Sequence, residues 1–139
     1  MRRYLLDSGI VSDWIDRRNS VDQRVAEAMR RGDRIGLGTP VVGELWGGVE
    51  FSRTSERNRA SLARVLARAT LWTFDKASAR EYGRLYAELR RTGHVIPQID
   101  MQIAAIALTL GNCTVVTKDS DFRLIPGLDL EDWSKPRAG

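Results

Sequence analysis

The sequence predicts an α/β fold, a three-layer α/β/α sandwich with a short, mainly parallel central sheet. Short apolar segments of strand length alternate along the chain with longer segments whose apolar residues recur at helical spacing. Such alternation is typical of parallel sheets whose crossover connections are helices. The length of 139 residues, with 42% hydrophobic and 29% charged residues interleaved, indicates a single domain over residues 1–139.

Five segments have the length and composition of strands. They cover residues 3–6, 34–38, 71–74, 114–117 and 128–130. The segment 114–117 is β-branched throughout, and 71–74 alternates apolar with polar residues as a half-buried strand does. We expect 128–130 to form an edge strand.

Six segments have apolar residues at helical spacing. They cover residues 8–15, 20–31, 39–49, 54–69, 76–91 and 100–108. We expect Ser8 and Ser20 to cap the first two helices, and Pro40 to stand in the first turn of the third. The last segment is apolar on nearly all sides, so this helix should lie inside the fold.

The chain is basic, with 22 Lys and Arg against 18 Asp and Glu and a net charge of +4. Nearly all the cations are Arg, whose planar guanidinium can bind two phosphate oxygens at once. Five of them decorate the fourth helical segment and are expected to point mainly outward: Arg53, Arg57, Arg59, Arg64 and Arg68. A GC-rich coding genome produces the same excess of Arg, so basicity permits a nucleic-acid partner without indicating one.

The sequence shows neither a secretion signal nor a membrane span. Residues 1–7 hold too few apolar residues for a signal peptide, and the longest purely apolar run, 103–108, is far shorter than the roughly 20 residues that cross a bilayer. Cys113 is the single cysteine and His94 the single histidine, which excludes an internal disulfide and a Cys/His zinc site. We expect a cytoplasmic protein without a membrane partner.

Five acids fall where an α/β fold places its ligands, beyond the carboxyl ends of strands or at the start of helices: Asp7, Glu44, Asp100, Asp119 and Asp121. Two carboxylates about 5 Å apart repel each other by about 3 kcal/mol at an effective dielectric constant near 20. Stability alone does not favour such a cluster. A hard divalent cation does, because Mg²⁺ and Mn²⁺ bind carboxylate, water and phosphate oxygens.

Each acid also has a structural interpretation. Asp7 and Asp100 can be favoured by a helix N-terminus, an effect of only about 0.3–1 kcal/mol that does not account for burial between apolar neighbours. Glu44 lies among Val41, Val42 and Leu45 and is expected on the inward side of its helix, while Asp119 and Asp121 have ordinary turn composition. We favour metal ligands for Asp7 and Asp100, since perturbed acids cluster at functional sites.

Other chemistries fit the sequence less well. With only His94, a ribonuclease that uses paired histidines is excluded, and Cys113, which precedes a buried strand, makes a poor nucleophile. The glycine-rich segment 36–43 has neither G-x-G-x-x-G nor P-loop spacing and is interpreted as a turn. A phosphoacceptor pocket of the receiver type lacks a further acid beside Asp7 and has Lys118 as its only candidate lysine.

Four sequence blocks together resemble the PIN-domain family, and in particular the VapC-type toxins of bacterial toxin–antitoxin pairs. They are Tyr4-Leu5-Leu6-Asp7-Ser8, Thr39-Pro40-Val41-Val42-Gly43-Glu44-Leu45 with Gly48, Ile99-Asp100-Met101-Gln102-Ile103-Ala104-Ala105, and Val116-Thr117-Lys118-Asp119-Ser120-Asp121-Phe122 with Gly127-Leu128 and Trp133. No single block is specific, but four in this order are. One departure is Gly9, where many relatives carry an Asn that helps to hold the first acid.

The resemblance implies an endoribonuclease in which one or two Mg²⁺ or Mn²⁺ ions activate a water for in-line attack on an RNA phosphodiester. It implies Asp7, Glu44 and Asp100 as catalytic, metal-binding residues, together with Asp119, Asp121 or both. It also implies a cognate antitoxin and a homodimer. The alternative is a PIN-like module without catalysis that binds RNA or a protein, although none of the four blocks has lost its acid.

Overall fold

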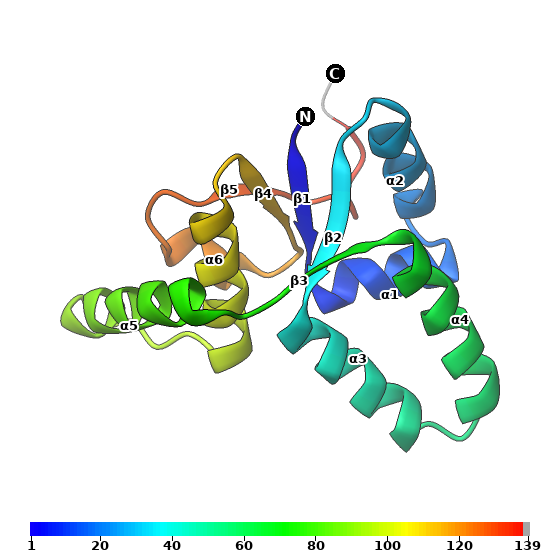
Figure 1. Ribbon diagram of the computed structural model, residues 1–139, viewed down its shortest axis with the longest axis horizontal. Coiled ribbons are helices and arrows are strands. Elements are labelled where there is room, and N and C mark those ends of the chain that lie inside the picture. The colour runs from blue at the N-terminus through cyan, green and yellow to red at the C-terminus, as the bar shows by residue number, and fades with distance from the viewer. Residues whose placement is uncertain (138–139) are drawn as a thin grey trace.

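A five-stranded sheet forms the centre of the protein, which we describe over residues 1–137 from a computed structural model (Figure 1). The strands are β1 (Arg3–Leu6), β2 (Arg34–Gly38), β3 (Thr70–Trp72), β4 (Cys113–Val116) and β5 (Asp129–Glu131). Their order is β3-β2-β1-β4-β5, and every neighbouring pair is parallel. The predicted parallel sheet is confirmed, with β5 at one edge.

Six α-helices and one 3-10 helix connect the strands within the described residues. They are α1 (Ser8–Asp16), α2 (Val21–Arg30), α3 (Thr39–Phe51), α4 (Ser55–Arg68), α5 (Lys76–Arg91), α6 (Gln98–Leu110) and η1 (Ser120–Leu124). Each predicted helix is confirmed to within a few residues at its ends. None of the helices in residues 1–137 is both long and apolar enough to span a bilayer.

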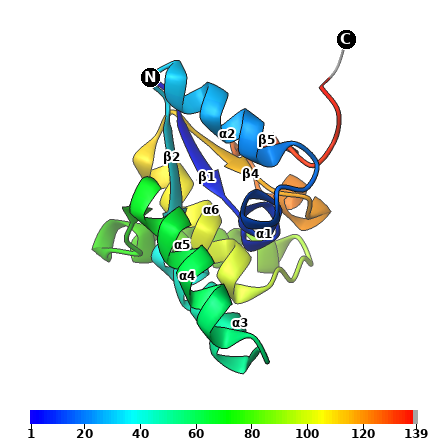
Figure 2. The ribbon, with the colours of Figure 1, turned by 90° about the vertical axis from the view of Figure 1, so that its right-hand side faces the viewer.

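The helices cover both faces of the sheet and make the predicted three layers. Helices α1 and α2 lie on one side, and α5 and α6 lie on the other (Figures 1 and 2). The chain passes outward from β1 to β2 and β3, then returns through α5 and α6 to β4 on the other side of β1. The connections therefore diverge between β1 and β4, the kind of switch point at which open α/β sheets bind ligands.

Helix α6 is the most buried helix, as its apolar composition predicts. Its buried side chains are Met101, Ile103, Ala104, Ala105, Ile106 and Ala107. They belong to the same core cluster as the strand residues Leu5, Leu37 and Val115. Because α6 is fixed in this core, the polar residues at its N-terminal end are held in a fixed position relative to the strands.

Three local expectations are wrong. Asp7, not Ser8, is the N-cap of α1, and Ser20 has a left-handed backbone (φ 58°) and makes no capping hydrogen bond with its side chain. The glycine-rich segment 36–43 is not a turn, since Gly36 and Gly38 belong to β2. Gly36 is needed there for close packing, because a Cβ atom at this position would lie 2.4 Å from the Thr70 carbonyl oxygen.

The four tryptophans divide between the core and its periphery. Trp14 and Trp133 are buried, as expected for core anchors, and Trp133 packs against Tyr4 with their ring centroids 5.0 Å apart. Trp46 and Trp72 are only half-buried. Trp14 and Trp133 therefore anchor the core.

Candidate metal centre

Asp7 follows β1 directly and begins α1. Its backbone N–H donates to the Val116 carbonyl at 2.9 Å, which continues the pairing of β1 with β4. Its carboxylate is held at both oxygens: Oδ1 accepts from the Ser8 N–H at 2.8 Å, and Oδ2 accepts from the Thr117 hydroxyl at 2.8 Å. These bonds fix the carboxylate at the end of β1.

Asp119 and Asp121 follow β4, the neighbour of β1. The Asp119 N–H donates to the Thr117 hydroxyl oxygen at 3.0 Å, and the Asp121 N–H donates to Asp119 Oδ1 at 2.9 Å. This second bond caps η1. The turn composition therefore has a structural role, because the Asp121 N–H orients the Asp119 carboxylate.

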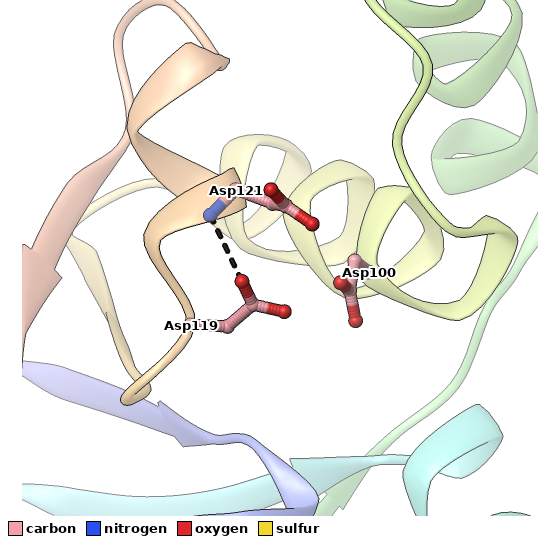
Figure 3. A group of neighbouring side chains, drawn as sticks. All are labelled: Asp100, Asp119 and Asp121. Carbon is pink, nitrogen blue, oxygen red and sulfur yellow. Dashed lines mark hydrogen bonds between the residues drawn. The ribbon is translucent and has the colours of Figure 1, made fainter.

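Asp100 reaches the same place from α6. It is the third residue of that helix, and its side chain faces those of Asp119 and Asp121 (Figure 3). Each of the three side chains offers a carboxylate oxygen, and these oxygens all lie within 4.8 Å of one another. We call Asp100, Asp119 and Asp121 the acid cluster, and Asp7 borders it.

The acid cluster concentrates negative charge around Asp100. Partial burial and the negative charges of Asp7, Asp119 and Asp121 raise the pKa of Asp100 from 3.8 to about 7. The charged form of Asp100 is therefore disfavoured by its surroundings at neutral pH. A cation among these oxygens would reverse that effect, so the donor set fits a hard divalent ion.

Glu44 lies outside the acid cluster. The prediction that it faces inward is wrong, because its side chain is exposed. Helix α3 fully buries only Val41 and then extends beyond the sheet beside α4 (Figure 1); Leu45 still packs against the core, but Glu44 lies on the exposed side of the helix. Glu44 lines a cavity of about 370 Å³ there, together with Ser8 and Ser12 of α1. Since Ser8 adjoins Asp7, Glu44 flanks the site.

Thr117 is the functional residue that the sequence analysis missed. The sequence places it in a β-branched strand and in the fourth of the sequence blocks without indicating a role, yet its hydroxyl donates to Asp7 and accepts from the Asp119 N–H. It therefore ties the acid that follows β1 to the acid that follows β4. A Thr at a strand end directly before a Lys-Asp pair is the only local signal, and it becomes informative once β1 and β4 are known to be neighbours.

Neither Cys113 nor His94 supplies nucleophilic or base chemistry at this site. Cys113 is buried at the start of β4, and burial raises the pKa of its thiol to about 11, so the thiolate is scarce at neutral pH. His94 lies in the loop between α5 and α6. The chemistry of this site is therefore that of its carboxylates.

The comparisons with known proteins agree with this geometry. The family model described as PIN domain matches residues 4–128, so the chain belongs to the PIN-domain family and, on the similarities that follow, to its VapC group of ribonucleases.

Ribonuclease VapC2 of Rickettsia felis is 32% identical over 133 residues, which cover 95% of this chain and 98% of that protein. The tRNA(fMet)-specific endonuclease VapC of Shigella flexneri is 35% identical over 91 residues, 66% of this chain and 69% of that protein. The crystal structure of VapBC2 from Rickettsia felis, bound to a DNA fragment from their promoter, contains a chain that superimposes with a TM-score of 0.87. That chain is 31% identical, and the match covers 94% of this chain and 98% of that one.

Proposed function

We propose that this protein is a divalent-metal-dependent endoribonuclease and the toxin of a toxin–antitoxin pair. The observation that carries the proposal is the meeting of Asp100, Asp119 and Asp121, with Asp7 beside them, at the switch point of the sheet. These four residues would hold Mg²⁺ or Mn²⁺. Glu44 would act from the flank, on the side of the groove between α1 and α3.

Each residue has a task that its surroundings support. The Ser8 N–H and the Thr117 hydroxyl orient Asp7, and the Asp119 carboxylate is oriented by the Asp121 N–H. Asp100 must release a proton near neutral pH before it can bind a cation. When bound, a divalent ion supplies Lewis-acid stabilisation of the phosphoryl oxygens and lowers the pKa of a water.

The substrate that we propose is RNA. The Shigella flexneri relative is named a tRNA(fMet)-specific endonuclease, which makes the initiator tRNA the first substrate to test.

The arginines of the α4 region are exposed, as predicted, and offer phosphate contacts: Arg53, Arg57, Arg59, Arg64 and Arg68. Arg59 is partly neutralised by its two hydrogen bonds to Glu50, each 2.9 Å long. If this surface binds RNA, affinity should fall steeply between low and physiological salt, as the dissociation constant from filter binding would show.

The partners that we propose are an antitoxin chain and a second copy of this chain. The support for the antitoxin is that the Rickettsia felis relative was crystallised as a VapBC complex. A toxin that cleaves cellular RNA would act in the cytoplasm, where its substrate is.

The deciding experiment is incubation of purified protein with total RNA and with initiator tRNA, in Mg²⁺, Mn²⁺ or chelator, with the cleaved ends mapped. The matched control is Asp100→Asn, which has nearly the same shape and lacks the charge. We expect discrete metal-dependent cuts by the parent and none by the variant. Identical RNA profiles from both proteins, at concentrations where binding is demonstrated, would leave the non-catalytic binding module as the better description.

A further inference from the structure

A buried carboxylate lies in α1 beside the site. Asp13 is only 2% exposed. Its Oδ2 atom accepts from Lys118 Nζ at 3.1 Å and from Asn19 Nδ2 at 3.2 Å, and its Oδ1 atom lies 3.3 Å from Arg18 Nε. A buried charge persists only with such partners. Arg18 and Asn19 directly follow the end of the same helix, whereas Lys118 lies 105 positions away from Asp13 in the sequence.

Lys118 stands between two residues that build the acid site. Thr117 on one side holds Asp7, and Asp119 on the other belongs to the acid cluster. Asp7 caps the same helix that carries Asp13. The segment that brings Asp119 and Asp121 is therefore attached to α1 at two points, through Thr117 to Asp7 and through Lys118 to Asp13. A second point of attachment restricts rotation about the first.

Gly9 provides the space that this second attachment needs. A Cβ atom at position 9 would lie 3.2 Å from Lys118 Cε and 3.8 Å from Nζ, so the lysine stem passes directly over the glycine. Gly9 stands in the first turn of α1 and has no positive φ, so its backbone accepts other residues. What glycine contributes here is the room for Lys118 to reach Asp13.

We propose that Lys118 is a positioning residue: by pairing with Asp13 across Gly9, it sets the place of Asp119 and Asp121 relative to Asp7, and so the affinity for a divalent cation. This inference rests on the metal site proposed above. It assigns Lys118 no contact with substrate or metal. Groups that orient the residues bound to a metal commonly change metal affinity when removed.

The charge of Lys118 and its positioning role make opposite predictions. If Lys118 acted only as a nearby positive charge, its removal would strengthen cation binding, because one repelling charge would be gone. If it positions the acids, its removal weakens binding. Lys135 supplies a matched control, since it lines the same small cavity as Lys118 and Asp119 but pairs with Asp132 on its own segment.

The test is the dissociation constant for Mn²⁺, measured without RNA by electron paramagnetic resonance of free Mn²⁺. We expect Lys118→Met to weaken binding about three- to tenfold, because the lysine is one step removed from the acids themselves. Lys118→Arg, which keeps a cation for Asp13, should restore most of the affinity, and Lys135→Met should leave it unchanged or stronger. Asp13 keeps Arg18 and Asn19 as partners, so Lys118→Met should still fold, with a melting temperature lowered by about 5 °C.

Equal or tighter Mn²⁺ binding by Lys118→Met would overturn the positioning role and leave the proposed function intact. Equal binding by parent and Asp100→Asn would instead refute the metal site. A second measurement needs no metal: in Lys118→Met, amide hydrogen exchange at Asp119 and Asp121 should be at least about fivefold faster. Unchanged exchange at these two amides would also overturn the inference.

Discussion

Asp13 and Asp100 are both helical carboxylates, the first buried and the second half-buried, and their surroundings are opposite. Asp13 is surrounded by Lys118, Arg18 and Asn19. Asp100 faces three other acids, which together with burial raise its pKa, and none of the ion pairs within residues 1–137 includes it. Asp13, which stabilises the fold, has Lys118 and Arg18 as cationic partners within the protein. Asp100 has no such partner among residues 1–137, so it is suited to bind a cation from solution.

The largest effect should come from removing the charge of Asp100. We expect Asp100→Asn to lower the rate of Mn²⁺-dependent RNA cleavage by at least about 100-fold, because a cation loses a charged ligand. The same change should raise the melting temperature of the metal-free protein, since it removes repulsion from Asp119 and Asp121. Calorimetry with chelator checks the second point, and a variant less stable than the parent would contradict the contrast with Asp13.

Removing the charge of Asp13 should lower the stability of the fold. Asp13→Asn leaves Lys118 and Arg18 without their buried partner, and we expect the free energy of unfolding to fall by about 2 kcal/mol in urea denaturation. The loss is at the lower end for a broken buried pair because both cations can turn to water, being 44% and 58% exposed. An unchanged urea midpoint would mean that Asp13 does not stabilise the fold.

The stability of the metal-free protein should depend on pH through Asp100. The pKa of Asp100 is about 7 in the folded protein and near 3.8 when unfolded, so the folded state holds the extra proton between these values. The stabilising contribution of protonated Asp100 is therefore present at low pH and lost as pH rises through about 7. Without metal, the parent should lose stability from pH 5 to pH 8 more than Asp100→Asn does.

Binding of Mn²⁺ should show the opposite trend with pH, because the cation requires the carboxylate form. Affinity should fall up to about tenfold per pH unit below about pH 7. Isothermal titration calorimetry in buffers of different ionisation enthalpy would reveal the released proton. A constant affinity from pH 6 to pH 8 would show that Asp100 does not titrate with the metal.

The smallest effect should come from Asp16, a neighbour of Asp13 on the same helix. Asp16 lies 3.1 Å from Arg18 but its side chain is 56% exposed. We expect Asp16→Asn to change the free energy of unfolding by no more than about 0.5 kcal/mol, since exposed ion pairs contribute little. A loss as large as that of Asp13→Asn would show that Arg18, and not burial, determines the importance of Asp13.

Four of the five acids predicted from the sequence meet at one end of the sheet, and the reason is local. Asp7, Asp119 and Asp121 follow strands that β-branched and apolar composition identifies, and Asp100 lies in the first turn of an apolar helix. Parallel strands end at the same edge, so residues after them are brought near one another. Val41, Val42 and Leu45 adjoin Glu44 and predict an inward side chain, but α3 packs only one side against the core and Glu44 lies on the exposed side.

The sequence by itself determined the alternation of strands and helices, the burial of α6 and the positions of the acids at the ends of these elements. These features depend on apolar periodicity within a dozen neighbouring residues. Only the tertiary structure decided that β1 lies between β2 and β4, that Thr117 bonds to Asp7, and that Lys118 crosses Gly9 to Asp13. The two side-chain contacts, Thr117 to Asp7 and Lys118 to Asp13, join residues more than 100 positions apart. They form only when the whole core has packed, so no local pattern of residues encodes them.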